Sequence, residues 1–139
     1  MKKVVFLLAF VLIGLTFLFA EEQFKKFDIG DGGIVKIRSL GGSFDVKIIY
    51  DKVENAPAMV RENIESNKYG KMPRNASSRF SVKFLDDNGR EVSKQEPFFT
   101  DFTLEDTEKG SIIVLKYQAQ GYSKNIYDRI ASVAVDYGR

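Results

Sequence analysis

The chain of 139 residues contains no cysteine, no histidine and no tryptophan. Histidine is the side chain that most often transfers protons near neutral pH and the commonest zinc ligand. The lack of cysteine excludes thiol nucleophiles, zinc–thiolate sites and disulfides. No Ser-x-x-Lys spacing occurs either, which leaves only a pair of carboxylates of glycosidase type, and no sequence feature selects such a pair. We therefore predict a protein that is not an enzyme and that needs no cofactor.

The only long apolar run is at the N-terminus. It extends from Val4 to Phe19, follows Lys2 and Lys3, and is followed by the small residue Ala20. A positive start, an apolar stretch and a small residue before the cut are typical of a secretory signal peptide, here residues 1–20. The alternative is an uncleaved anchor, because roughly 20 apolar residues span a bilayer. Both interpretations predict an extracytoplasmic protein, periplasmic or secreted, of a bacterial envelope.

The charge balance of the exported part differs from that of the whole chain. The sequence has 21 basic and 19 acidic residues, and removal of Lys2 and Lys3 leaves 21 − 2 = 19 basic against 19 acidic residues. A neutral exported domain is a poor candidate for binding nucleic acid. Residues 21–139 are enough for one domain with a modest core. We expect contact with a membrane only through residues 1–20, if they are not cleaved.

Alternation of apolar and polar residues dominates the exported part. Phe44, Val46, Ile48 and Tyr50 share one face of an extended segment, which is the two-residue period of a half-buried strand. Turn signals such as Asp31-Gly32-Gly33 separate the segments. The predicted strands are Phe24–Ile29, Ile34–Leu40, Phe44–Tyr50, Phe80–Phe84, Arg90–Ser93, Phe98–Leu104, Ile112–Leu115 and Val133–Tyr137. The pattern predicts an all-β antiparallel sandwich of seven to eight strands.

One segment, residues 55–79, interrupts this alternation. Asn55 is a good helix cap and Pro57 suits a first turn, so a short helix is predicted to continue to about Asn67. The loop that follows, Lys68–Arg79, carries basic residues and no acid. Long ordered loops are often functional. The alternative is a helix that plugs one end of the sandwich and a loop without a role.

The candidate binding residues lie in this loop and near the last strand. They combine positive charge with tyrosines, which stack on sugars or anchor protein interfaces: Lys68, Tyr69, Lys71, Arg74, Tyr122 and Tyr127. Each tyrosine ring could instead fold back over the edge of the sandwich. Because tryptophan is absent, we rank protein contact above carbohydrate binding.

The densest group of oxygen ligands is Asp86-Asp87-Asn88. Calcium binds such groups, but the spacing does not fit the helix–loop–helix calcium pattern. The sequence Asp-Asp-Asn-Gly is also what a type I′ hairpin turn requires. We predict the turn and no metal site.

The segment SRFSVKFLDDNGREV, the segment FFTDFTLEDTEKGSIIVLKY and the final SVAVDY resemble the later strands of bacterial extracytoplasmic immunoglobulin-like or fibronectin type III-like domains. The resemblance covers about the second half of the chain and implies a sandwich, but no site residues. The sequence thus favours an exported β-sandwich with a non-catalytic binding or structural role, in contact with an envelope protein through residues 55–79. A carbohydrate- or calcium-binding module and a minimal carboxylate-dependent hydrolase remain the alternatives.

Overall fold

The computed structural model describes residues 23–70, 78–120 and 123–138. The described part is mostly strand, with two short α-helices and two 3-10 turns between the strands. In chain order the elements are β1 (Lys25–Gly30), β2 (Gly33–Ser39), β3 (Ser43–Tyr50), η1 (Val53–Asn55), α2 (Ala58–Lys68), β4 (Ser81–Leu85), β5 (Glu91–Gln95), η2 (Phe99–Asp101), β6 (Phe102–Thr107), β7 (Gly110–Gln120), α3 (Lys124–Arg129) and β8 (Ser132–Asp136). Among these residues no helix is long and apolar enough to cross a bilayer.

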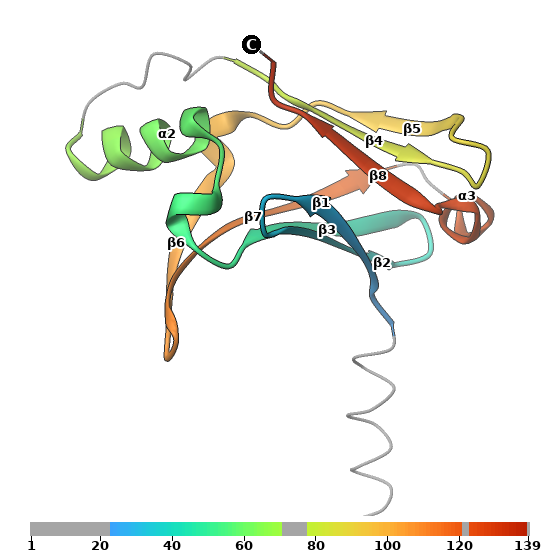
Figure 1. Cartoon of the computed structure of the whole chain (residues 1–139). Coiled ribbons are helices and arrows are strands. Elements are labelled where there is room, and N and C mark those ends of the chain that lie inside the picture. Colours follow the sequence, from blue (N-terminus) through green and yellow to red (C-terminus); the bar gives the residue numbers. More distant parts are fainter. Residues whose placement is uncertain (1–22, 71–77, 121–122, 139) are drawn as a thin grey trace, which may run out of the picture.

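The strands form two antiparallel sheets. The larger sheet has the order β1-β2-β3-β7-β6 and the smaller has the order β5-β4-β8. Figure 1 shows the small sheet packed over one face of the large sheet, with α2 and α3 at opposite ends. The predicted all-β sandwich is confirmed.

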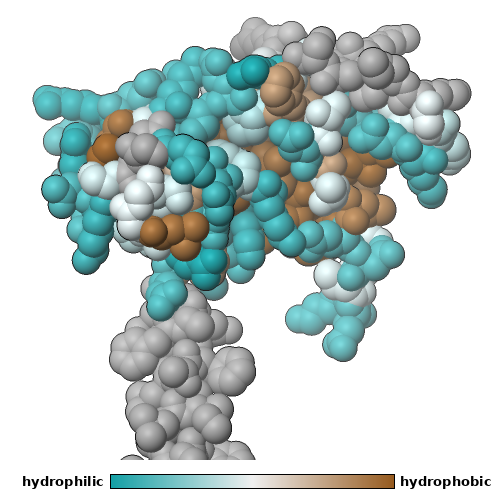
Figure 2. Space-filling model, turned by 180° about the vertical axis from the view of Figure 1, so that it is seen from behind, coloured by the Kyte–Doolittle hydropathy of each residue, from teal (hydrophilic) through white to brown (hydrophobic). Residues whose placement is uncertain are grey.

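The core lies between the two sheets and is built by the alternation seen in the sequence. Phe44 of β3 and Phe84 of β4 are fully buried, and their ring centroids lie 6.1 Å apart across the sandwich. All buried members of this core lie between Val35 and Val133. The part of the chain after residue 20 therefore carries its own core. Figure 2, seen from behind, shows that hydrophobic residues also reach the surface between hydrophilic ones.

The predicted helix begins later than expected. Asn55 belongs to η1, and Pro57, in extended conformation, is the cap of α2. The carbonyl of Pro57 accepts hydrogen bonds from the amides of Val60 and Arg61. Proline lacks an amide hydrogen, so it starts a helix without losing a hydrogen bond.

The predicted strand Phe98–Leu104 is wrong in its first half. Residues Phe99–Asp101 form the turn η2, and β6 begins only at Phe102. The turn buries Phe99, whose ring lies 5.3 Å from that of Phe80. Burial of this ring outweighs the local preference for strand. The helix α3 was not predicted either.

The hairpin turn at Asp86–Gly89 is confirmed as a turn but not as type I′. That type requires positive φ at both central residues, and among the described non-glycine residues only Asp31 has a positive φ. The chain instead makes a type I turn closed by Gly89, whose φ is 73°. The type I′ geometry occurs between β1 and β2, where Asp31 and Gly32 have φ of 52° and 74°.

The strand order bears on the family resemblance. In an immunoglobulin constant-type sandwich the second and third strands belong to different sheets. Here β2 and β3 are neighbours in one sheet, paired from Gly33 opposite Tyr50 to Ser39 opposite Phe44. Membership of that family stays a prediction.

Candidate functional site

The described residues among those predicted to bind a partner are not gathered in one place. Lys68 and Tyr69 lie at the C-terminal end of α2, where the Lys68 ammonium is 6.0 Å from the Tyr69 ring centroid and Tyr69 is 70% exposed. Lys71, Arg74 and Tyr122 lie outside the described residues. Tyr127 belongs to α3, at the opposite end of the sandwich from α2 (Figure 1).

Tyr127 is engaged within the fold. Its hydroxyl donates to the backbone carbonyls of Ile37 (3.2 Å) and Gln23 (3.0 Å), and its ring lies 5.6 Å from that of Phe44. The ammonium of Lys25 lies 4.8 Å from the ring centroid and donates to the Tyr127 carbonyl. These contacts attach α3 to the edge of the large sheet. They correspond to the alternative in which the ring folds back over the sandwich.

A different cluster lies on the outer face of the large sheet, the face opposite the core. Four lysines occupy directly paired positions on four neighbouring strands. Lys26 of β1 is opposite Lys36 of β2, Lys36 is opposite Lys47 of β3, and Lys47 is opposite Lys116 of β7. We call Lys26, Lys36, Lys47 and Lys116 the lysine row.

Strand alternation places the lysine row outside. In β2, Lys36 stands between the fully buried Val35 and Ile37, and in β3, Lys47 stands between Val46 and Ile48. Side chains that are directly opposite in an antiparallel pair have Cβ atoms about 5 Å apart, and like charges there destabilise the sheet. The row therefore contains three successive repulsive pairs.

Few acids compensate this charge. Lys116 pairs with Glu105 at 2.8 Å, and next to the row Arg38 pairs with Asp45 at 2.6 Å. No described acid lies within ion-pair distance of Lys26, Lys36 or Lys47. Three lysines of the row thus have no ion-pair partner among the described acids, and the outward acid beside them in β1 is Asp28, which accepts a hydrogen bond from the amide of Gly30 at 2.8 Å.

An aromatic ring lies beside the lysine row. Phe24, just before β1, has its ring centroid 5.4 Å from the Lys47 ammonium and 5.0 Å from the Arg38 guanidinium. Cations at this distance from a ring face are attracted by its quadrupole. The ring orders two cations on the outer face without neutralising either.

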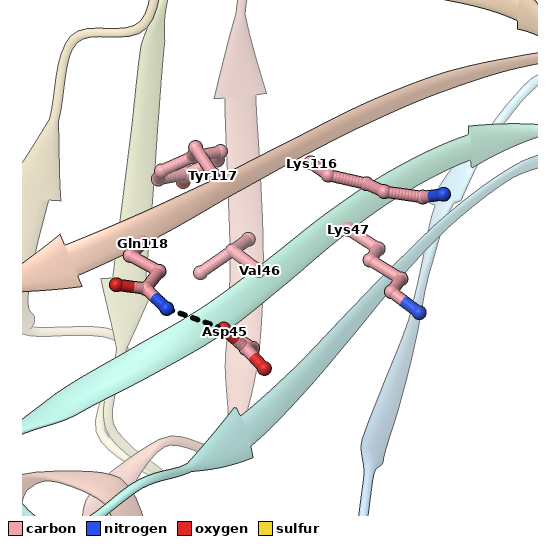
Figure 3. A pocket seen from close by; sticks show the side chains of 6 residues that line it. All are labelled: Asp45, Val46, Lys47, Lys116, Tyr117 and Gln118. Carbon is pink, nitrogen blue, oxygen red and sulfur yellow. Dashed lines mark hydrogen bonds between the residues drawn. The ribbon is translucent and has the colours of Figure 1, made fainter.

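A shallow depression of about 410 Å³ lies between β3 and β7, and Lys47 and Lys116 of the lysine row are among the residues that line it. Figure 3 shows the side chains of Lys47 and Lys116 lying side by side with both ammonium groups pointing the same way. At the other end of the depression the Gln118 amide donates to Asp45 at 3.3 Å (Figure 3). Lys116 is paired with Glu105, which leaves Lys47 as the lysine of the depression without an ion-pair partner among the described residues.

An apolar row runs beside the lysine row on the same face. Ile34 of β2 is opposite Ile49 of β3, and Ile49 is opposite Val114 of β7. None of these three belongs to the core cluster or packs against it. Ile34 is 38% exposed, whereas Val114 is 2% exposed. We call Ile34, Ile49 and Val114 the apolar row.

The acidic turn has its own internal partners. One carboxylate oxygen of Asp86 accepts hydrogen bonds from the amides of Asn88 and Arg90, both at 2.9 Å, and the other lies 3.8 Å from the Arg129 guanidinium. Within the described residues no three acidic side chains are grouped so that they could hold a metal ion. The hydrogen bonds explain why the turn has this sequence.

No family model, no curated protein and no solved structure matches the chain. The site must therefore be interpreted from its own geometry. Sequence reasoning missed the lysine row. The available signal was a lysine in each of three predicted strands (Lys26, Lys36 and Lys47) and one directly after a fourth (Lys116), but only the register aligns them.

Proposed function

We propose that the chain is an exported, non-catalytic binding domain of the bacterial envelope that binds a polyanionic partner through the outer face of its large sheet. The observation that carries the proposal is the lysine row, in which Lys26, Lys36 and Lys47 are adjacent and lack ion-pair partners among the described residues. Evenly spaced cations on a flat face suit a ligand with repeated negative charge.

In the free domain the lysine row lowers the stability of the large sheet. A like-charge pair directly across two strands changes stability by about 0.2–1 kcal/mol in the unfavourable direction. The small sheet also has one such pair, Lys83 opposite Lys94, but there each lysine has an acid, Glu91 at 3.9 Å and Glu96 at 2.9 Å. The large sheet has three adjacent lysine–lysine pairs, and among the described residues one acid, Glu105, forms an ion pair with a member of the row. A bound polyanion would offset that cost.

A second surface is proposed for protein contact, at the end of α2. It rests on the exposure of the Tyr69 ring beside Lys68. An exposed tyrosine next to a cation is a common element of protein interfaces. Of the candidate binding residues within residues 55–79, the structure describes Lys68 and Tyr69.

Binding to a soluble polyanion tests the main proposal. Dextran sulfate added to residues 21–139 should bind at low salt and be released at high salt, because exposed charges are screened beyond a Debye length of about 8 Å at physiological ionic strength. Replacing both Lys36 and Lys47 by glutamine should weaken binding at least tenfold. The matched control is the double glutamine variant of Lys83 and Lys94, which removes the same charge from the small sheet. Equal weakening by both variants would contradict a site on the large sheet.

A further inference from the structure

We infer that the polyanionic partner is the surface of a bilayer that contains anionic phospholipids, against which the outer face of the large sheet lies flat. The inference rests on the proposed function and names its partner. It adds a membrane contact by the folded domain to the one expected of residues 1–20 alone.

The outer face of the large sheet is both basic and apolar. The lysine row and the apolar row are successive outward positions on the same strands, Lys36 beside Ile34 in β2 and Lys47 beside Ile49 in β3. A lysine next to apolar surface lays its methylene stem along it and extends its ammonium toward the headgroups. Amphipathic helices that lie on anionic membranes combine apolar side chains with lysine, and on this face the accessible apolar part is Ile34, 38% exposed, next to the half-buried Ile49. A soluble polyanion does not require apolar side chains beside the lysines.

The outer face also includes β1, which follows closely after the apolar N-terminal run. The run ends at Phe19, and Lys26, the first member of the lysine row, is seven residues later. Seven extended residues reach at most about 25 Å. As long as the run is not cleaved, it therefore keeps β1 close to the membrane surface.

A second copy of the chain does not suit this face. Two copies that met through this face would bring two lysine rows together, and like charges would repel across the interface. Charge complementarity instead requires an anionic surface. Each lysine near such a membrane contributes about a fivefold gain in binding, so Lys26, Lys36 and Lys47 together supply about a hundredfold.

Vesicle flotation of residues 21–139 tests the inference, because this part carries the whole described core. The protein should float with vesicles of 70% phosphatidylcholine and 30% phosphatidylglycerol at low salt and stay behind with pure phosphatidylcholine. The double glutamine variant of Lys36 and Lys47 should bind the anionic vesicles at least tenfold more weakly. The double glutamine variant of Lys83 and Lys94 should bind like the unaltered protein. Thermal melting of each variant establishes that it is folded.

Ile34→Ser separates a lipid surface from other polyanions. This variant should bind anionic vesicles several-fold more weakly and bind dextran sulfate unchanged, because a bilayer has an apolar layer for the exposed Ile34 side chain and dextran sulfate has none. Binding to dextran sulfate without binding to vesicles would overturn the inference and leave the proposed function standing. Failure to bind either would overturn both. Equal affinity of Ile34→Ser and the unaltered protein for vesicles would also overturn the membrane inference.

Discussion

Tyr137, just beyond β8, joins the two sheets through its hydroxyl. It shares a hydrogen bond with the hydroxyl of Tyr50 in β3, and its ring lies 5.1 Å from that of Phe80. Burial is the largest cause that raises the pKa of Tyr137, with the neighbouring Tyr50 adding to it. Burial also raises the pKa of Tyr50. Both phenols are therefore held neutral in the fold.

This predicts how stability changes at high pH. A group whose pKa is raised by folding contributes stability fully below its unfolded pKa, about 10 for tyrosine, and loses it as the pH rises further. The free energy of unfolding should therefore fall above pH 10, by up to about 1.4 kcal/mol per pH unit for each such tyrosine. Tyr137→Phe should cost about 1 kcal/mol at pH 7 through the lost hydrogen bond and should fall less steeply above pH 10. Urea unfolding between pH 7 and pH 11 measures both effects. Parallel curves for the two proteins would contradict the assignment.

At the scale of the element, the β1–β2 hairpin depends on Gly32. Its φ is 74°, and a Cβ added there would lie 2.8 Å from the side chains of Asn55 and Asp51. Left-handed backbone costs a residue with a Cβ about 1–2 kcal/mol. Gly32→Ala should therefore lower the free energy of unfolding by at least about 1 kcal/mol in urea.

Gly42, in the next hairpin, is the matched control. Its φ is not in the left-handed region and a Cβ there would meet nothing within 4 Å. Gly42→Ala should leave stability unchanged or raise it by up to about 1 kcal/mol, because alanine restricts the unfolded chain. Equal losses at both positions would show that the turn geometry is not the cause.

The large sheet as an element should become more stable when its lysine row is interrupted. Lys36→Glu converts two like-charge contacts, with Lys26 and Lys47, into attractive ones. We expect the free energy of unfolding to rise by about 0.5–2 kcal/mol at low salt, and by less at high salt. The control Lys83→Glu in the small sheet should bring no such gain, because it places two acids together at Glu91. A less stable Lys36→Glu protein would show that the row is not repulsive.

At the scale of the whole molecule, a prediction concerns the processing of the apolar N-terminal run. A small residue, Ala20, followed by acids predicts cleavage before Glu21. N-terminal sequencing of protein recovered from the envelope should therefore give Glu21 as the first residue. Recovery of membrane-bound protein that begins at Met1 or Lys2 would indicate an anchor. Protein that begins at Glu21 would then depend on the large sheet for contact with a bilayer.

The sandwich could be predicted from the amino-acid sequence alone. The alternation around Phe44 and Phe84 fixes which side chains face the core, and glycines mark the turns, because both signals act over a few residues. The helix α2 was also predicted, but its cap is Pro57 and not Asn55. These features depend on local periodicity and backbone preference.

Features that depend on residues distant in the sequence could not be predicted and became visible in the folded chain. Burial of Phe99 replaced strand by a turn, and Tyr127 came to lie over Phe44. The register between strands brought Lys26, Lys36, Lys47 and Lys116 into one row, although Lys116 is far from the others in sequence. Period-two patterns say which face a residue occupies but not which residue stands opposite it, because register is set by pairing across the sheet.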